Sequence, residues 1–451
     1  MNILLPIETI NRELDFKLVL AGYLSGKGHQ IYIGQHDFLM KLVPSLNAGG
    51  LYIGKNIFSE SADKEKGEKY YFLKKNNFDI IYLNEEGAIF LKGEINMSKR
   101  LKLLYNLDFF DENDVVCVWG ELQKKIEEKR STKVKIFCTG HPRFDLCKKS
   151  WHYLFETKVN DIKKIYKKFI LINGNFSASN PGYGLKNLFS KERMANEKMR
   201  MDFIENFAWT NKQLISMVSL THELALAFPE LNFIFRPHPS ENHNYYKILF
   251  NGVKNIFVKH DGNVIPWILA TELLIHDGCT TAIEATLAGI PVVNYKINFD
   301  DSRDIWLPNQ MGDQINTVEK IILHIKKNSK IDFKFTTYPR DEKVLECLHN
   351  FKENSYESFL KIISQKINDD KSKSNNKVPS IRIKKLFLEQ TIKNFLINIL
   401  KPNKKDLLIY HNTKFYGFCE NDIKKKFKDI SKILKKNIIF KFHNSNLISI
   451  Q

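Results

Sequence analysis

The sequence predicts an α/β protein made of two doubly wound domains and a basic C-terminal appendage. Short apolar runs alternate with charged helical stretches, this alternation restarts after a charged connection near 150–167, and the excess of cations lies at the end of the chain. A chain of 451 residues is also too long for one hydrophobic core. We therefore expect an N-terminal Rossmann-like domain at 1–155, a second at 165–370, and a Lys-rich linker and helical tail at 371–451.

The first domain is predicted from a strand, helix and strand at its start, over residues 2–8, 12–28 and 29–34. Three β-rich runs that end in glycine follow, at 78–87, 115–120 and 134–140. Charged stretches of helical character separate them. This order is typical of a parallel sheet with helices on both faces.

The second domain repeats the rhythm after the connection. It begins with an apolar run at 168–176 and a long helical stretch that reaches 230. Four further strands are predicted, at 232–239, 255–260, 273–278 and 291–295. Two doubly wound domains in succession explain this pattern most simply.

The net charge of +18 is unevenly distributed. Residues 371–451 contain 19 Lys plus Arg and 5 Asp plus Glu, a balance of +14, which leaves about +4 for residues 1–370. Within the tail, residues 381–400 place Ile, Leu and Phe at roughly helical spacing with Lys between them, which fits a helix lying on an anionic membrane. A helical appendage packed on the body is the alternative. The patterns of nucleic-acid-binding proteins are absent from the sequence.

The remaining composition predicts a cytoplasmic protein. If the basic tail binds the membrane, the protein lies peripherally on the inner face of the cytoplasmic membrane. No apolar run approaches the ~20 residues of a membrane span, and the first residues lack the basic start and cleavage site of a secretory signal. The six cysteines are scattered without a C-x-x-C pair, as expected for reduced thiols.

Ligands of open parallel sheets bind beyond the carboxyl ends of the strands. Polar residues follow four of the predicted strands, at 84–87, 173–177, 236–241 and 276–281. These four strand ends are the candidate binding positions.

The strand end at 276–281 resembles an anion site. Asp277 and Gly278 are followed by Thr280 and Thr281 at the start of a predicted helix. Glycine permits a tight turn, and a helix N-terminus with hydroxyls nearby suits a phosphate. Plain helix capping by the threonines is the alternative.

The strand end at 236–241 carries Arg236 and then His238 between two prolines, the second of which is Pro239. Proline on each side restricts the backbone, so the imidazole is held where it can donate a hydrogen bond to a phosphate, with the guanidinium adding charge nearby. A similar His-Pro pair occurs at 141–142. We interpret His141 as a turn residue and keep its neighbour Arg143 as a candidate for substrate binding.

The strand end at 84–87 carries two adjacent carboxylates, Glu85 and Glu86, followed by Gly87. A carboxylate delivered to a cleft by a strand can accept a proton from a hydroxyl of an acceptor. A solvated turn is the alternative.

The acidic pair with glycine, the later His-Pro motif and the hydroxyl pair that opens a helix together resemble bacterial GT-B glycosyltransferases that use CMP-activated ulosonic acids. These include sialyltransferases, polysialyltransferases and Kdo transferases, and stretches such as "LPIETINRELDFKLVLA", "TGHPRFD" and "HDGCTTAIEATLAGIPVV" are similar to surface carbohydrate biosynthesis proteins. The likeness covers roughly residues 1–365. It implies a GT-B fold, in which two Rossmann-like domains face a cleft.

The resemblance also implies roles for individual residues. Glu85 would be the general base and Glu86 its support, while His238 would bind the phosphate of the CMP leaving group. The hydroxyl pair of the family would be Thr280 and Thr281, although relatives usually have serines. Two further donor contacts are implied, a ribose contact by Glu284 and a contact by Asn175.

The implied activity is transfer of an ulosonic acid, such as Kdo or a nonulosonate, from a CMP donor to a hydroxyl of a capsule or lipopolysaccharide glycan. No metal and no cofactor are implied, because helix termini and side chains hold the phosphate. A CDP-glycerol glycerophosphotransferase, a UDP-sugar transferase and a non-catalytic polysaccharide assembly protein are the alternatives. The choice of sugar, the acceptor and the inverting or retaining outcome stay open.

Overall fold

The computed structural model describes residues 1–55, 57–58, 67–130, 133–190, 194, 196–328, 342–369, 375–400, 408–409 and 411–451. The chain forms two compact units. The first unit comprises Met1–Gly87, Gly93–Leu146 and Leu345–Gln451, and the second comprises Ala88–Lys92 and Cys147–Val344.

The first unit is built on an eight-stranded sheet in the order β13-β14-β2-β1-β3-β4-β5-β6. The six strands that come first in the chain run parallel. They are β1 (Asn2–Ile7), β2 (Gln30–Gln35), β3 (Gly50–Gly54), β4 (Phe78–Leu83), β5 (Val115–Val118) and β6 (Lys135–Cys138). Strands β1 and β3 are buried at every position, as expected for a parallel sheet covered on both faces. Their near-continuous apolar sequence reflects that burial.

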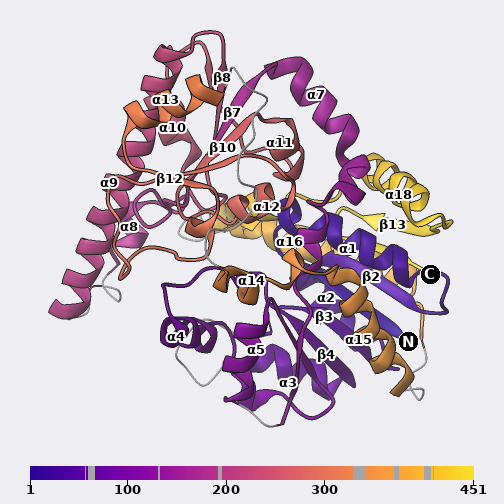
Figure 1. Ribbon diagram of the computed structural model, residues 1–451. Coiled ribbons are helices and arrows are strands. Elements are labelled where there is room, and N and C mark those ends of the chain that lie inside the picture. The colour runs from indigo at the N-terminus through magenta and orange to yellow at the C-terminus, as the bar shows by residue number, and fades with distance from the viewer. Residues whose placement is uncertain are drawn as a thin grey trace. The chain divides into compact units, whose positions relative to one another are not determined.

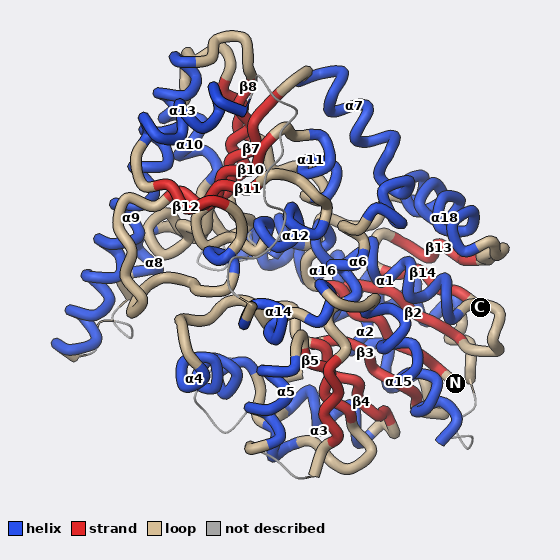
Figure 2. Tube along the Cα trace, viewed as in Figure 1, coloured by secondary structure: helices blue, strands red, loops and turns tan. Residues whose placement is uncertain are grey.

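Helices accompany these strands (Figures 1 and 2). They are α1 (Ile10–Leu24), α2 (His36–Leu42), α3 (Glu68–Lys75), α4 (Glu94–Leu104), α5 (Glu121–Glu128), α6 (Pro142–Asp145), α14 (Lys343–Cys347), α15 (Ser355–Asp369), α16 (Ser380–Leu400) and α18 (Glu420–Leu434). The carboxylate of Glu13 accepts the backbone N–H groups of Glu8 and Thr9, which stabilises the start of α1.

The C-terminal tail is part of the first unit's sheet. Strand β14 (Leu447–Ile450) pairs antiparallel with β2, and β13 (Phe440–Asn444) pairs with β14. Helix α18 buries Ile423, Phe427 and Ile430 and contacts α1. The structure thus divides the chain differently from the sequence-based boundaries: the chain changes unit between Leu146 and Cys147, and residues 345–451 return to the first unit instead of forming a separate helical appendage.

The second unit has a six-stranded, all-parallel sheet in the order β12-β11-β10-β7-β8-β9. Its strands are β7 (Phe169–Asn173), β8 (Asn232–Arg236), β9 (Ile256–Val258), β10 (Leu273–His276), β11 (Val292–Tyr295) and β12 (Asp313–Ile315). Its helices are α7 (Glu156–Tyr166), α8 (Leu185–Leu188), α9 (Glu197–Ala227), α10 (His243–Leu249), α11 (Ile265–Ala270), α12 (Thr281–Leu287) and α13 (Val318–Asn328).

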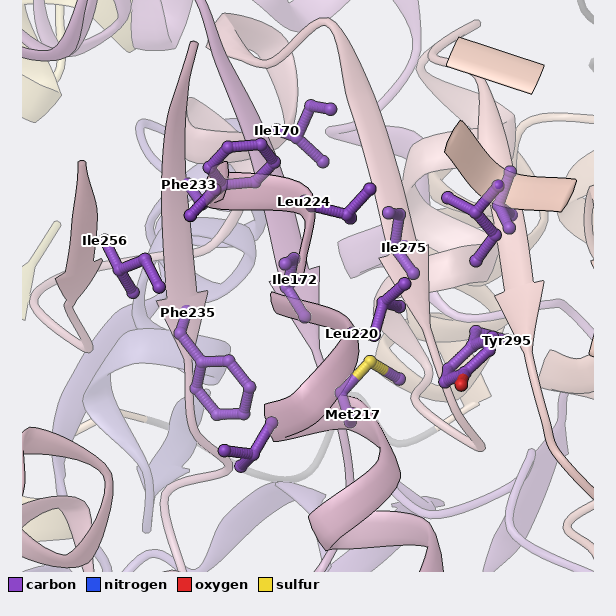
Figure 3. Packing of buried hydrophobic residues seen from close by; sticks show 14 of the residues in the cluster. Ile170, Ile172, Met217, Leu220, Leu224, Phe233, Phe235, Ile256, Ile275 and Tyr295 are labelled. Atoms are coloured by element: carbon purple, nitrogen blue, oxygen red, sulfur yellow. The ribbon is translucent and has the colours of Figure 1, made fainter. Parts of the chain in front are cut away.

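The core of the second unit lies between this sheet and the C-terminal half of α9 (Figure 3). Leu220 and Leu224 of α9 pack with Ile172, Phe233 and Ile275 of the strands, and all five are fully buried. The predicted α/β class with two doubly wound units is confirmed by the two sheets. Among the described residues, no helix is both long and apolar enough to cross a membrane.

Candidate functional site

The order of the strands defines a position for ligands in each sheet. In the second unit, β7, β8 and β9 extend to one side and β10, β11 and β12 to the other, so the order reverses between β7 and β10. In the first unit the reversal lies between β1 and β3. Crevices beyond the carboxyl ends of strands at such reversals are the usual ligand positions of doubly wound sheets.

At the reversal in the second unit, the ends of β7 and β10 are joined by hydrogen bonds. The side-chain amide of Asn173 donates to Oγ1 of Thr281 at 3.2 Å, and the backbone N–H of Asp277 donates to the carbonyl of Asn173. Gly278 has a φ of 58° and makes the tight turn predicted for it. Its N–H donates to Oδ1 of Asn309 at 2.8 Å.

The two threonines at the start of α12 differ in their environment. Thr281 is buried, and its hydroxyl is engaged with Cys279 and Asn173. Thr280 is the N-cap residue, is half-buried, and makes no capping bond with its side chain. Thr280 therefore suits contact with a ligand better than Thr281 does.

Two carboxylates of this region are buried. Asp277 lies 2.9 Å from Nζ of Lys296, which also pairs with Asp304. Burial raises the pKa of Asp277, and Lys296 opposes that shift. Glu284 is 7% exposed within α12, so its predicted ribose contact requires a ligand that reaches into the unit.

The next strand, β8, ends in the Arg-Pro-His-Pro motif. The ring of His238 is half-buried, and Nδ1 lies 2.6 Å from Oγ of Ser240 and accepts the backbone N–H of Ser240 at 3.3 Å. An Nδ1 that accepts a backbone N–H leaves the proton of the neutral ring on Nε2, the nitrogen that can donate to a phosphate oxygen. Pro239, also half-buried, lies between these two residues in the chain.

Arg236 is oriented by the protein itself. Its guanidinium donates to the carbonyls of Asp261 and Gly262 and lies 5.8 Å from the ring of Trp267. These contacts give Arg236 a structural function in holding residues 261–262. Its predicted contact with substrate is untested.

Glu241 ends the same segment, 236–241, and no role was assigned to it from the sequence. Its carboxylate is 4% exposed, accepts the N–H of Phe176 at 2.8 Å and accepts the hydroxyl of Tyr246. Burial raises the pKa of Glu241 to about 7. Glu241 thereby fixes the loop after β7, in which the half-buried Asn175 accepts a hydrogen bond from Ser177.

In the first unit, Glu85 follows β4 and is 2% exposed. Its Oε2 lies 3.1 Å from Nε2 of His141 and 3.9 Å from Nη1 of Arg143. Burial alone would raise the pKa of Glu85, but His141 and the nearby cations hold it well below its usual range. Burial lowers the pKa of His141, and the carboxylate of Glu85 opposes that shift.

His141 also has the structural function that the sequence predicted. Its Nδ1 accepts the N–H of Arg143 and caps α6. Sequence reasoning missed its contact with Glu85. Glu85 follows β4 and His141 follows β6, and the carboxyl ends of parallel strands lie at the same edge of the sheet. This rule could have indicated that Glu85 and His141 lie close together.

Glu86 is the more exposed member of the acidic pair, with 31% of its side chain accessible. Its Oε1 lies 2.7 Å from Nη1 of Arg12 and 4.0 Å from Nζ of Lys55. Burial opposes ionisation here too, yet Arg12 and Lys55 lower the pKa of Glu86 to about 2.

The ion pairs continue to the reversal between β1 and β3. Lys55, directly after β3, lies 3.1 Å from Glu8, directly after β1. Lys414 of the tail lies 3.0 Å from the other carboxylate oxygen of Glu8. Sequence reasoning did not predict a contribution from the tail to this site.

Three buried nitrogen donors near the acidic pair have no hydrogen-bond partner among the described residues. They are Nδ2 of Asn84 and the Nε atoms of Arg12 and Arg143. Buried polar groups are nearly always paired in proteins. Three unpaired donors beside Glu85 and Glu86 indicate a place for water or for the oxygens of a ligand.

Gly87 has a packing reason to be glycine. A Cβ atom at this position would lie 2.5 Å from the ring of Trp119, which is fully buried and donates from Nε1 to the carbonyl of Asn84. Gly87 thus lets the segment after β4 pass close to that ring. Within each unit, the predicted residues do gather at the carboxyl end of the sheet.

No protein-family model matches the chain. No curated protein matches it either. Several solved structures are similar over most of its length. UDP-GlcNAc 2-epimerase from Methanocaldococcus jannaschii is 12% identical, with 81% of this chain and 100% of that chain covered and a TM-score of 0.49. UDP-GlcNAc 2-epimerase from Neisseria meningitidis bound to UDP-GlcNAc is 12% identical, with 82% of this chain and 100% of that chain covered and a TM-score of 0.46. The wall teichoic acid polymerase TagF is 10% identical, with 82% of this chain and 88% of that chain covered and a TM-score of 0.48.

Proposed function

We propose that the chain is a glycosyltransferase of bacterial surface polysaccharide synthesis that transfers an ulosonic acid from a CMP donor to a glycan hydroxyl, without a metal ion. The observation that carries the nucleotide part is the junction of β7 and β10, where Asn173 contacts Thr281 and Gly278 turns the chain toward Thr280. The CMP part rests on the order of the acidic, His-Pro and hydroxyl motifs in the sequence.

In this proposal the second unit binds the donor. Nε2 of His238 donates to the phosphate of CMP, and the hydroxyl of Thr280 adds a second donor. Hydrogen bonds to the phosphate stabilise the charge that develops on the leaving group as the glycosidic bond breaks. Lys296 lies beside Asp277 and Asp304, so its charge is already compensated.

The first unit binds the acceptor. The family resemblance implied that Glu85 is the general base, with Glu86 as support. Burial gives a reason to exchange these roles, because Glu86 is 31% accessible and Glu85 only 2%. The ion pairs of Glu86 with Arg12 and Lys55 must loosen before its carboxylate can accept a proton. Glu86 then takes the proton, while Glu85 positions His141 and Arg143.

The first test is thermal unfolding of the full chain with CMP, CDP or UDP. We expect CMP at about 100 times its Kd to raise Tm by several degrees. His238→Ala should lose this shift, and His443→Ala in β13 should keep it. Stabilisation by UDP alone would contradict the donor, and stabilisation by CDP alone would favour a glycerophosphotransferase.

The second test is release of CMP from a panel of CMP-ulosonates in the presence of glycan acceptors. Release that depends on both substrates supports transfer. Donor binding without release from any member of the panel would favour a non-catalytic assembly protein.

A further inference from the structure

Helix α16 of the tail has two apolar faces. One face lies against the first unit, where Ile383 and Leu386 are buried and the helix contacts α2 and β13. The other points to solvent. Its members are 48% to 79% exposed and follow one another at intervals of seven, four, three and four residues, as residues on one side of a helix do: Ile381, Leu388, Ile392, Phe395 and Ile399.

Two lysines lie on this outward face. Lys384 and Lys385 are three and four residues after Ile381, and four and three residues before Leu388, so both belong to the same side of the helix. Both are exposed. Residues 371–451 contain 19 Lys plus Arg and only 5 Asp plus Glu.

We propose that the outward face of α16 binds an anionic membrane surface. Apolar side chains interleaved with lysines suit the boundary between acyl chains and headgroups, because the lysine stems lie along the apolar layer while the ammonium groups reach the phosphates. Anionic lipids attract nearby Lys and Arg by about 1 kcal/mol each. The proposal does not depend on the nucleotide or on the reaction.

A second copy of the chain is a poorer occupant for this face. In a twofold interface the same patch meets itself, so Lys384 and Lys385 of both copies would be brought into one interface. Like charges buried together oppose association. The positive balance of the whole tail adds to this repulsion, whereas the same charge favours an anionic bilayer.

The test uses point variants of the full chain, because removing the tail would also remove β13 and β14 from the sheet. Flotation is measured with phosphatidylcholine vesicles and with vesicles that contain about 30% phosphatidylglycerol. The test variant is Ile392→Glu with Phe395→Glu. The matched control is Leu226→Glu with Ile248→Glu, which replaces two exposed apolar residues of α9 and α10.

We expect the wild type and the control to float with the anionic vesicles, and the test variant to lose at least about tenfold in partitioning. Lys384→Glu with Lys385→Glu should lose binding to anionic vesicles as well. Because all these positions are exposed, thermal unfolding should stay unchanged and show that each variant is folded.

Two results would overturn the proposal. One is equal flotation of the wild type and the α16 variants. The other is a dimer of the wild type in sedimentation velocity that Ile392→Glu with Phe395→Glu dissociates, together with no flotation; that result would assign the face to a second copy.

Discussion

Nζ of Lys414 lies 3.0 Å from Oε1 of Glu8, which joins the tail to the end of the first strand. Glu8 in turn pairs with Lys55, whose ammonium group is 4.0 Å from Glu86. The tail therefore belongs to the network of charges around the proposed acceptor site. Tyr416 supports this position, since its hydroxyl donates to Asn11 at 2.8 Å.

The first prediction concerns Lys414. We expect Lys414→Ala to lower kcat/KM for the acceptor several-fold, because Glu8 then competes for Lys55 and alters the charge beside Glu86. The pair is partly exposed, so the free energy of unfolding should change by less than about 1 kcal/mol. Lys441→Ala, which removes an exposed lysine of β13, is the control. Equal acceptor kinetics for both variants would exclude Lys414 from the site.

The second prediction separates the two adjacent carboxylates. Glu86→Gln should lower kcat at least about 100-fold while nucleotide binding stays near the wild type, because it removes the half-buried base. It should also lower Tm modestly, because the ion pairs with Arg12 and Lys55 are lost. Glu85→Gln should lower the free energy of unfolding by about 3 kcal/mol, since it removes a buried charge that faces Arg143 and other cations. Urea unfolding and steady-state kinetics measure both quantities.

The outcome also decides the sequence-based role of Glu85. If Glu85→Gln abolishes transfer with normal stability and Glu86→Gln turns over normally, Glu85 is the base after all. Burst kinetics or a trapped sugar adduct on either residue would instead indicate a nucleophile and a retaining mechanism.

The third prediction concerns the C-terminal hairpin. Removal of residues 437–451 should destabilise the first unit, because Leu447, Ile448 and Ile450 are buried and their loss exposes the edge of β2. We expect a lower Tm and concentration-dependent aggregation, measured by light scattering. Ile439→Ser, at a 70% exposed position, is the control and should behave as the wild type. A truncated chain with an unchanged Tm would show that the hairpin adds no stability.

The strand ends were the most predictable part of the molecule. Apolar runs that stop on Asn84, Asn173, Arg236 and His276 mark where buried strands leave the sheet, and local composition alone determines that signal. The tight turn at Gly278 follows from the same reasoning. Which strand ends meet depends on the order of the strands, and that order is a long-range property which the sequence pattern does not contain.

The tail was less predictable for a physical reason. Its lysines dominate its composition, although alternating apolar residues in "IIFKFH" and "LISI" flank the turn-forming "NSN" and could have indicated a hairpin. Pairing of β14 with β2 is antiparallel and joins segments more than four hundred residues apart. Likewise, the contact of His141 with Glu85 links two strand ends that look independent in the sequence.

The last prediction is a dependence of stability on pH that originates at Glu241. Burial raises its pKa from 4.5 to about 7 in the folded protein. Between these two values the folded state keeps a proton that the unfolded state has released, so stability falls as pH rises from about 4.5 to 7. The full effect is about 3 kcal/mol, from 1.36 kcal/mol for each pKa unit.

Glu241→Gln should remove this contribution, because the amide is neutral at every pH and its oxygen can still accept the N–H of Phe176. We therefore expect the variant to gain stability relative to the wild type as pH rises from 5 to 8, as measured by urea unfolding at several pH values. Glu230→Gln, in an exposed turn before β8, is the control and should follow the wild type. If the free energies of unfolding of Glu241→Gln and the wild type differ by the same amount across this range, Glu241 is ionised in the folded protein. The hydroxyl of Tyr246 would then donate its hydrogen bond to a charged carboxylate.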